Sequence, residues 1–188
     1  MLAPSLSKRR DRWFVRLHDL LVELEQRVEN FDPAELAENE AFVTALIDAS
    51  RIAMGTHLEE KLDLLKQCLL RMALDQERDT FLDLRFFRYI DDLDPEHFLI
   101  LKYLATPGAW FDGKCIDRPQ LAMGSRRSLM GQAQLPLSGV PLDVALRDLS
   151  DRALADTGSL GTVMSGGAIW EGCATELGSQ LLDFVEVI

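Results

Sequence analysis

The feature that most constrains the fold is a change of composition at Thr106-Pro107. Before this point the chain has one glycine, Gly55, whereas the other eleven of its twelve glycines and four of its seven prolines follow it. Glycine and proline destabilise the interior of a helix, so long helices are favoured only in the first part. The sequence therefore predicts a helical first half and a second half of shorter elements joined by turns.

The first half carries apolar residues at helical spacing. In residues 10–30 they form one stripe: Trp13, Leu17, Leu20, Leu21, Leu24 and Val28. Asp32-Pro33 and Asn39 are typical helix starts, and Thr56-His57-Leu58-Glu59 is interpreted as a capping box. The helix that it opens has a two-heptad seam at Leu58, Leu62, Leu65, Leu69 and Met72. Whether residues 40–74 form one kinked helix or two stays open. A polar break is predicted at Asp75–Asp79.

The second half has the element order of a winged helix. A helix over residues 95–105 is apolar on nearly every face at 98–104 and must be surrounded by protein. The long stretch 107–141 is irregular, with one candidate helix at 119–131. The remaining elements are a helix over 141–155 that starts at Pro141, a hairpin of 160–164 and 168–173 around Ser165-Gly166-Gly167, and a last helix that opens at Thr175-Glu176.

Charge indicates the class of partner. The net charge is −11, and residues 31–104 carry sixteen acidic against eight basic residues. An acidic surface repels phosphate groups at long range, which disfavours nucleic acid and anionic membranes as partners. We therefore expect a protein partner or self-association, with no membrane and with nucleic acid as the less favoured partner.

Cysteine usage and the N-terminal residues favour the cytoplasm. Cys68, Cys115 and Cys173 are odd in number and have no C-x-x-C spacing, which is typical of reduced thiols. The basic cluster before Trp13 resembles the start of an export leader, but Arg16 and later charged residues interrupt the apolar run. No stretch approaches the roughly 18 apolar residues of a membrane span, so we expect a cytoplasmic protein.

No pattern of catalytic, cofactor-binding or metal-binding residues is recognisable. The chain has no Walker loop, G-x-S-x-G elbow, G-x-G-x-x-G fingerprint or H-E-x-x-H motif. His18, His57 and His97 lie far apart, and none ends a Glu-x-x-His pair of the kind that holds metals in helical bundles. We therefore expect structural histidines and assign no catalytic residue, cofactor or metal.

Two groups of arginines are candidates for contact with nucleic acid or another anion. Arg9 and Arg10 belong to a basic N-terminal arm, and Arg126-Arg127 form the only basic pair beyond it. The arm lies at the end of its helix where the dipole disfavours cations. It therefore either frays or contacts an acidic surface, and the acidic middle of the chain is the nearest one.

Trp110-Phe111 and Arg147 are candidates for contact with a protein partner. Exposed aromatic residues favour interfaces, although the same pair would also fill space between the two halves of the protein. Arg147 lies in the helix over 141–155, where acidic residues outnumber basic ones, and the wing over 159–174 has no lysine or arginine. DNA-binding winged helices neutralise several phosphates with basic residues, so this part is expected to contact protein.

The chain resembles a known group of bacterial proteins in three segments. They are Phe42–Ala73, Ile90–His97 and the terminal run Thr175-Glu176-Leu177-Gly178. In layout it is similar to the abortive-infection alpha-like proteins of phage defence, which have a helical N-terminal part and a degenerate winged-helix end. The resemblance implies a role in bacterial defence or mobile-element biology, and it brings no catalytic residue with it.

These observations predict a mainly α protein. A helical bundle, residues 1–94, packs on a small α+β winged-helix-like part, residues 95–188, and short connections favour one compact unit. The predicted function is a non-enzymatic interaction or regulatory module. One alternative is a DNA-associated transcriptional regulator that uses the basic arm with Arg126 and Arg127. A further alternative is an enzyme or ligand sensor in a cleft between the halves near His97 and Trp110.

Overall fold

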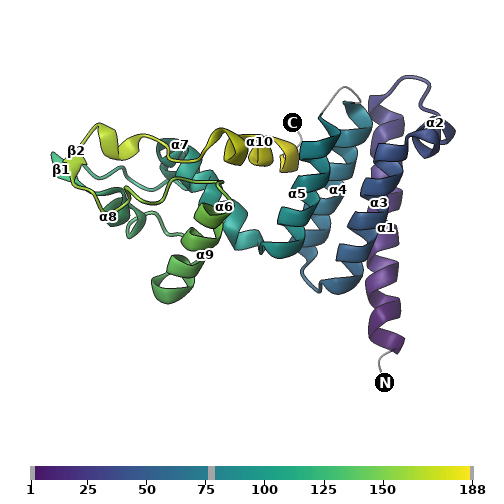
Figure 1. The fold of residues 1–188 in the computed structure, drawn as a ribbon, viewed down its shortest axis with the longest axis horizontal. Coiled ribbons are helices and arrows are strands. Elements are labelled where there is room, and N and C mark those ends of the chain that lie inside the picture. The colour runs from purple at the N-terminus through teal and green to yellow at the C-terminus, as the bar shows by residue number, and fades with distance from the viewer. Residues whose placement is uncertain (1–2, 76–78, 187–188) are drawn as a thin grey trace. The chain divides into compact units, whose positions relative to one another are not determined.

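The chain forms two compact units in a computed structural model that describes residues 3–75 and 79–186. The first unit comprises Met1–Asp94 and Asp183–Ile188, and the second comprises Pro95–Leu182. The protein is mainly helical, as predicted, and a small two-stranded antiparallel sheet lies in the second unit (Figure 1).

In the first unit, two helices begin at the predicted caps Asp32 and Asn39, whereas the first helix begins at Ala3, ahead of the predicted residues 10–30. The helices of this unit are α1 (Ala3–Arg27), α2 (Pro33–Glu38), α3 (Glu40–Gly55), α4 (Glu59–Leu74) and α5 (Thr80–Asp92). The side chains of Asp32, Asn39 and Asp79 accept hydrogen bonds from backbone N–H groups in the first turns of α2, α3 and α5, which satisfies donors that a helix start leaves unpaired. Residues 40–74 thus form two helices. The predicted polar break includes residues 76–78, which lie outside the described residues.

The predicted capping box at the start of α4 is wrong. The N-cap of this helix is Leu58, which makes no side-chain cap hydrogen bond. Thr56 instead ends α3 as its C-cap, and its Oγ1 atom accepts a hydrogen bond from the N–H of Leu58 at 3.2 Å. A threonine hydroxyl satisfies the backbone equally well in a turn or at a helix start, so the sequence pattern does not distinguish the two.

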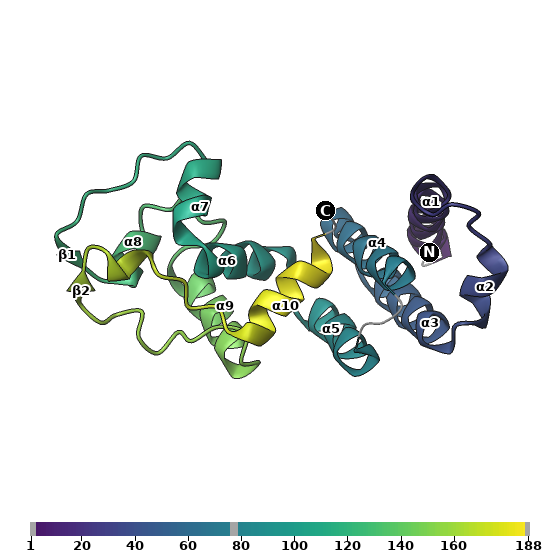
Figure 2. The ribbon, with the colours of Figure 1, turned by 90° about the horizontal axis from the view of Figure 1, so that it is seen from above.

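α3 and α4 form the centre of the first unit. α1 packs on one side of this pair, and α5 packs on the other (Figure 2). The predicted seam of α4 is buried at Leu62, Leu65, Leu69 and Met72. On the α5 side the ring of Phe184 lies 5.2 Å from that of Phe86 and 5.9 Å from that of Phe87, measured between centroids. A residue from beyond the second unit therefore completes this core.

The second unit differs from the prediction in its helices. Its elements are α6 (Pro95–Ala105), α7 (Pro107–Gly113), β1 (Met123–Gly124), α8 (Arg126–Met130), α9 (Gly139–Asp151), β2 (Met164–Ser165), a 3₁₀ turn η1 (Ala168–Trp170) and α10 (Glu176–Val185), whose last residues belong to the first unit. α7 was not predicted, although Pro107 suits a first turn. Only 126–130 of the candidate helix 119–131 is helical. α9 begins before Pro141 and ends at Asp151, because the chain turns at Ala153 with a φ of 56°.

Burial of α6 agrees with its apolar sequence. Five of its apolar side chains are buried: Phe98, Ile100, Leu101, Tyr103 and Leu104. Leu99 is 43% exposed and is the exception on this segment. The prediction that protein surrounds residues 98–104 is thus confirmed on most sides of the helix.

The predicted hairpin around Ser165-Gly166-Gly167 is wrong. β2 pairs with β1 in antiparallel register, with Met123 opposite Ser165, and the segment that follows Gly167 is the 3₁₀ turn η1. The reason is a close approach of two backbones: a Cβ atom on Gly166 would lie 1.9 Å from the carbonyl oxygen of Leu121. The absence of a Cβ atom on Gly166 therefore lets the backbone of Leu121 pack against it. Neither Gly166 nor Gly167 has the positive φ of a tight hairpin turn.

Two further glycines of the second unit allow close backbone contacts. A Cβ atom on Gly172 would lie 2.2 Å from the carbonyl oxygen of Ala105, and one on Gly178 would lie 2.1 Å from that of Leu154. Real Cβ atoms do not approach an oxygen so closely. The glycine-rich composition of this half thus serves packing of one segment on another, as well as turns.

Candidate protein-interaction surface

The basic N-terminal arm contacts α3 and α4. The Nη1 atom of Arg9 donates hydrogen bonds to the carbonyl oxygens of Met54, at 3.0 Å, and Gly55, at 3.3 Å. These carbonyls lie in the last turn of α3, where helix carbonyls lack partners and a cation is favoured. Arg9 is thus engaged within the chain and stabilises the end of α3.

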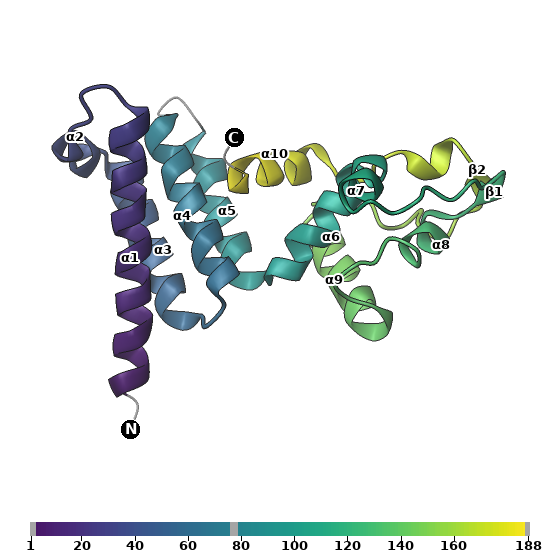
Figure 3. The same cartoon turned by 180° about the vertical axis from the view of Figure 1, so that it is seen from behind.

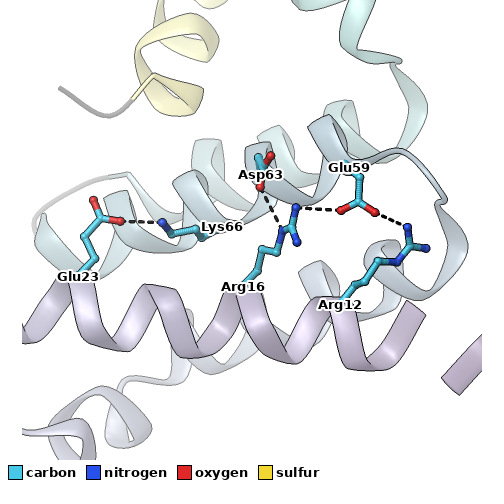
Figure 4. Close-up of polar contacts among 6 residues, drawn as sticks. All are labelled: Arg12, Arg16, Glu23, Glu59, Asp63 and Lys66. Carbon is cyan, nitrogen blue, oxygen red and sulfur yellow. Dashed lines mark hydrogen bonds and ion pairs between the residues drawn. The ribbon is translucent and has the colours of Figure 1, made fainter. Parts of the chain in front are cut away.

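Arginines further along α1 form ion pairs with the start of α4 (Figure 4). Arg16 lies 2.8 Å from Glu59 and 3.1 Å from Asp63, and Arg12 pairs with the same Glu59. In the reverse sense, Lys66 of α4 lies 2.7 Å from Glu23 of α1. The acidic first turn of α4 favours these cations. Of the two alternatives for the basic arm, fraying or contact with an acidic surface, the structure shows contact with the acidic middle of the chain.

The other candidate anion-binding arginines differ in their solvent exposure and in their contacts within the chain. Arg126 is largely buried, with 14% of its side chain exposed. It donates to the carbonyl oxygens of Glu171 and Ala168 at 3.1 and 3.2 Å. Arg127 pairs with Asp143 and keeps 38% of its side chain exposed. Arg10 is 60% exposed and contacts only its chain neighbour Asp11 among the described residues. Arg126 therefore holds loops together, whereas Arg10 is open to solvent.

The aromatic pair proposed for partner contact lies in the core of the second unit. Phe111 is fully buried and Trp110 is 8% exposed. The indole N–H of Trp110 donates to the carbonyl oxygen of Ala133 at 2.8 Å, and its ring meets that of Tyr103 edge to face at 6.1 Å. Their burial argues for packing as their role in this unit.

Arg147 and Arg127 line one surface groove of about 300 Å³ between α8 and α9. The same groove contains Asp143 and Asp151, so its charges largely cancel. Sequence reasoning assigned the two arginines to different roles, and the fold places them together. The mixed charge gives this groove no preference for anions.

The residues named for the ligand-sensor alternative do not form one site. Trp110 lines a groove of about 300 Å³ between α6 and α7, together with Leu99 and Lys114. His97 is not in that lining; its Nε2 atom lies 3.4 Å from Asp148 Oδ2 of α9. Across residues 3–75 and 79–186, no cluster of three or more His, Cys, Asp or Glu side chains is placed to hold a metal ion. None of the helices in these ranges is long and apolar enough to cross a membrane.

The free cysteines give a direct test of the described burial. Cys115 is exposed, whereas Cys68 and Cys173 are buried. Burial also raises the pKa of the Cys173 thiol, which lowers the fraction of reactive thiolate. Treatment of the native protein with iodoacetamide at neutral pH is expected to label Cys115 alone, and labelling in denaturant should reach all three sites. Peptide mass spectrometry measures this, and fast native labelling of Cys173 would contradict its placement.

The outer face of α1 is the surface that sequence reasoning missed. Four large apolar side chains are exposed there: Phe14 at 58%, Val15 at 53%, Leu21 at 39% and Val22 at 37%. Trp13, Leu20 and Leu24 are buried on the opposite side of the helix. Leu21, which was expected on the buried stripe, is therefore outside the core. Figure 3 shows α1 at the edge of its unit, with its N-terminal turns beyond the ends of α3 and α4.

A signal for this face was present in the sequence. Leu20 and Leu21 are adjacent, and adjacent residues of a helix point about 100° apart, so only one of them can point to the centre of a core. The run Trp13-Phe14-Val15 has the same property. The apolar arc of this helix is therefore wider than the arc that packing on one neighbouring core would bury. The extra width indicated a second contact surface.

Comparisons with family models, with curated proteins and with solved structures give no significant match to this chain.

Proposed function

We propose that this chain is a non-enzymatic interaction module that acts through protein contacts made by the outer face of α1. The observation that carries the proposal is the exposure of Phe14, Val15, Leu21 and Val22 on one helix. Exposed apolar residues are ordinary when scattered, but four of them on one side of a single helix are typical of a contact surface. The exposed His18 and Asp19 lie between the two apolar pairs. The net charge of −11 also favours protein over nucleic acid as the partner.

The alternative of a DNA-associated regulator has weaker support. Of its four arginines, Arg9 and Arg126 donate hydrogen bonds to backbone carbonyls of the chain itself. Releasing them to grip phosphates would leave those carbonyls without partners. Arg10 and Arg127 alone give few phosphate contacts, and affinity for DNA depends on their number.

The resemblance to abortive-infection alpha-like proteins supplies the proposed setting. In that setting the module takes part in defence of a bacterium against phage, or in the biology of mobile elements. Its contribution is to bring proteins together, since the resemblance carries no catalytic residue.

Site-specific photo-crosslinking in living cells tests the proposed function. A benzophenone amino acid replaces Val15 on the outer face of α1, and the matched control carries it at Val163, an exposed apolar residue of the second unit. We expect discrete protein adducts from position 15, and weaker or none from position 163. Mass spectrometry then identifies the protein in each adduct. Equal yields from both positions would contradict the proposal, because they indicate random collisions.

A further inference from the structure

The outer face of α1 has a stripe whose charges are opposite at its two ends. Arg10, Phe14, Leu21 and Glu25 are spaced four, seven and four residues apart, which places them within an arc of about 60° around the helix. All four are exposed. The stripe thus runs from a cation through two apolar residues to an anion, over roughly 22 Å of helix, and the exposed His18 lies beside its midpoint.

We propose that a second copy of this chain binds this stripe, with the two α1 helices antiparallel. The proposal rests on the proposed function and names its partner. The pair Arg10 and Glu25 and the pair Phe14 and Leu21 have the same midpoint, between Leu17 and His18. A twofold axis at that point places each Phe14 against the partner's Leu21 and each Arg10 against the partner's Glu25. Every contact then occurs twice, as in closed dimers.

Charge favours the antiparallel over the parallel arrangement. Two parallel copies would place Arg10 against the partner's Arg10 and Glu25 against the partner's Glu25, and like charges face to face are repulsive. The contact of Arg10 with Asp11, at 3.3 Å, joins two side chains that are both at least 60% exposed, so solvent weakens it. Glu25 has no ion pair among the described residues. Both ends of the stripe are therefore available to a second copy.

The small extent of the stripe favours weak association. One helix face of this length buries less area than a standard protein interface, which indicates reversible association with a dissociation constant on the order of 10 μM. The protein is then monomeric at concentrations well below this dissociation constant and dimeric at concentrations well above it.

Sedimentation velocity of the purified protein, from about 1 to 300 μM, measures this association. We expect Phe14→Asp to raise the dissociation constant at least tenfold, because it places a carboxylate against an apolar side chain. The matched control is Phe81→Asp, since Phe81 is 72% exposed on α5 and lies outside the stripe; it should leave the constant unchanged. Circular dichroism checks that both variants keep their helices.

Charge reversal tests the antiparallel register. Arg10→Glu and Glu25→Arg should each weaken self-association about three- to tenfold, because each places like charges together. The double variant R10E/E25R should restore it, and an equimolar mixture of the two single variants should form the mixed dimer.

Three results would overturn the proposal. They are a wild-type protein that stays monomeric throughout, association that Phe14→Asp leaves unaltered, and charge reversals without rescue. These are separable from failure of the proposed function. If the protein is monomeric but position 15 still forms adducts with a different protein, the proposed self-association is wrong. The proposed function of the outer face of α1 then still holds.

Discussion

Gly178→Ala is expected to destabilise the Pro95–Leu182 unit by about 3 kcal/mol, at the upper end of the usual cost of overpacking. Gly178 lies in the first turn of α10, and a Cβ atom there would lie 2.1 Å from the carbonyl oxygen of Leu154 and 3.3 Å from Leu101 Cδ1. The oxygen belongs to the backbone and cannot rotate away. Helix propensity predicts the opposite sign, since alanine is favoured over glycine by about 1 kcal/mol.

Gly113→Ala is the matched control for this substitution. Gly113 also lies in a helix of the second unit, α7, but a Cβ atom on it would meet nothing within 4 Å. We expect it to be neutral or stabilising by up to about 1 kcal/mol. Urea denaturation measures the free energy of unfolding of both variants. Hydrogen exchange of peptides from α6 and α9 then shows whether the change lies in the second unit. Equal stability of the two variants would show that the approach of α10 to Leu154 is looser than described.

Phe184→Ala is expected to cost the first unit about 3 to 5 kcal/mol. Phe184 is fully buried, and its ring packs on those of Phe86 and Phe87. Its removal leaves a cavity between α5 and the end of α10 and forfeits two aromatic contacts. Hydrogen exchange should accelerate in α4 and α5, although these helices lie far from residue 184 along the chain.

Asp183→Ala is the control for the loss of Phe184. Asp183 is the exposed neighbour in the same helical turn, and surface substitutions usually change stability by less than about 0.5 kcal/mol. If F184A and D183A gave the same exchange pattern, the assignment of residue 184 to the core of the first unit would be wrong.

The parts of the fold that sequence predicted correctly depend on neighbours along the chain. Asp32 and Asn39 cap helices because each accepts a hydrogen bond from a backbone N–H two or three residues later, so the pattern contains its own partner. The leucine seam of α4 is likewise a property of one helix. The sheet is different: β1 and β2 are separated by α8 and α9, and nothing local to Met164-Ser165 indicates that its partner is Met123-Gly124.

The candidate site shows the same limit. Sequence placed Arg9 and Arg126 among contacts to an external anion, but both donate to backbone carbonyls that lie far from them in the chain. Every residue has a backbone carbonyl, so no residue type in the sequence indicates which carbonyls these arginines bind. The outer face of α1 was predictable in part, because Leu20 and Leu21 cannot share one core. Its exposure depended on where α3 and α4 pack.

The membership of Asp183–Ile188 in the first unit has a consequence for the order of folding during translation. The second unit is an insertion within the first, because the chain leaves the first unit at Asp94 and returns to it at Asp183. When a ribosome has made residues 1–94, the rings of Phe86 and Phe87 still lack that of Phe184. The inserted unit is synthesised completely before that ring emerges. Residues 1–94 are therefore made before the inserted unit but acquire their finished core after it, and until then their aromatic side is open to chaperones.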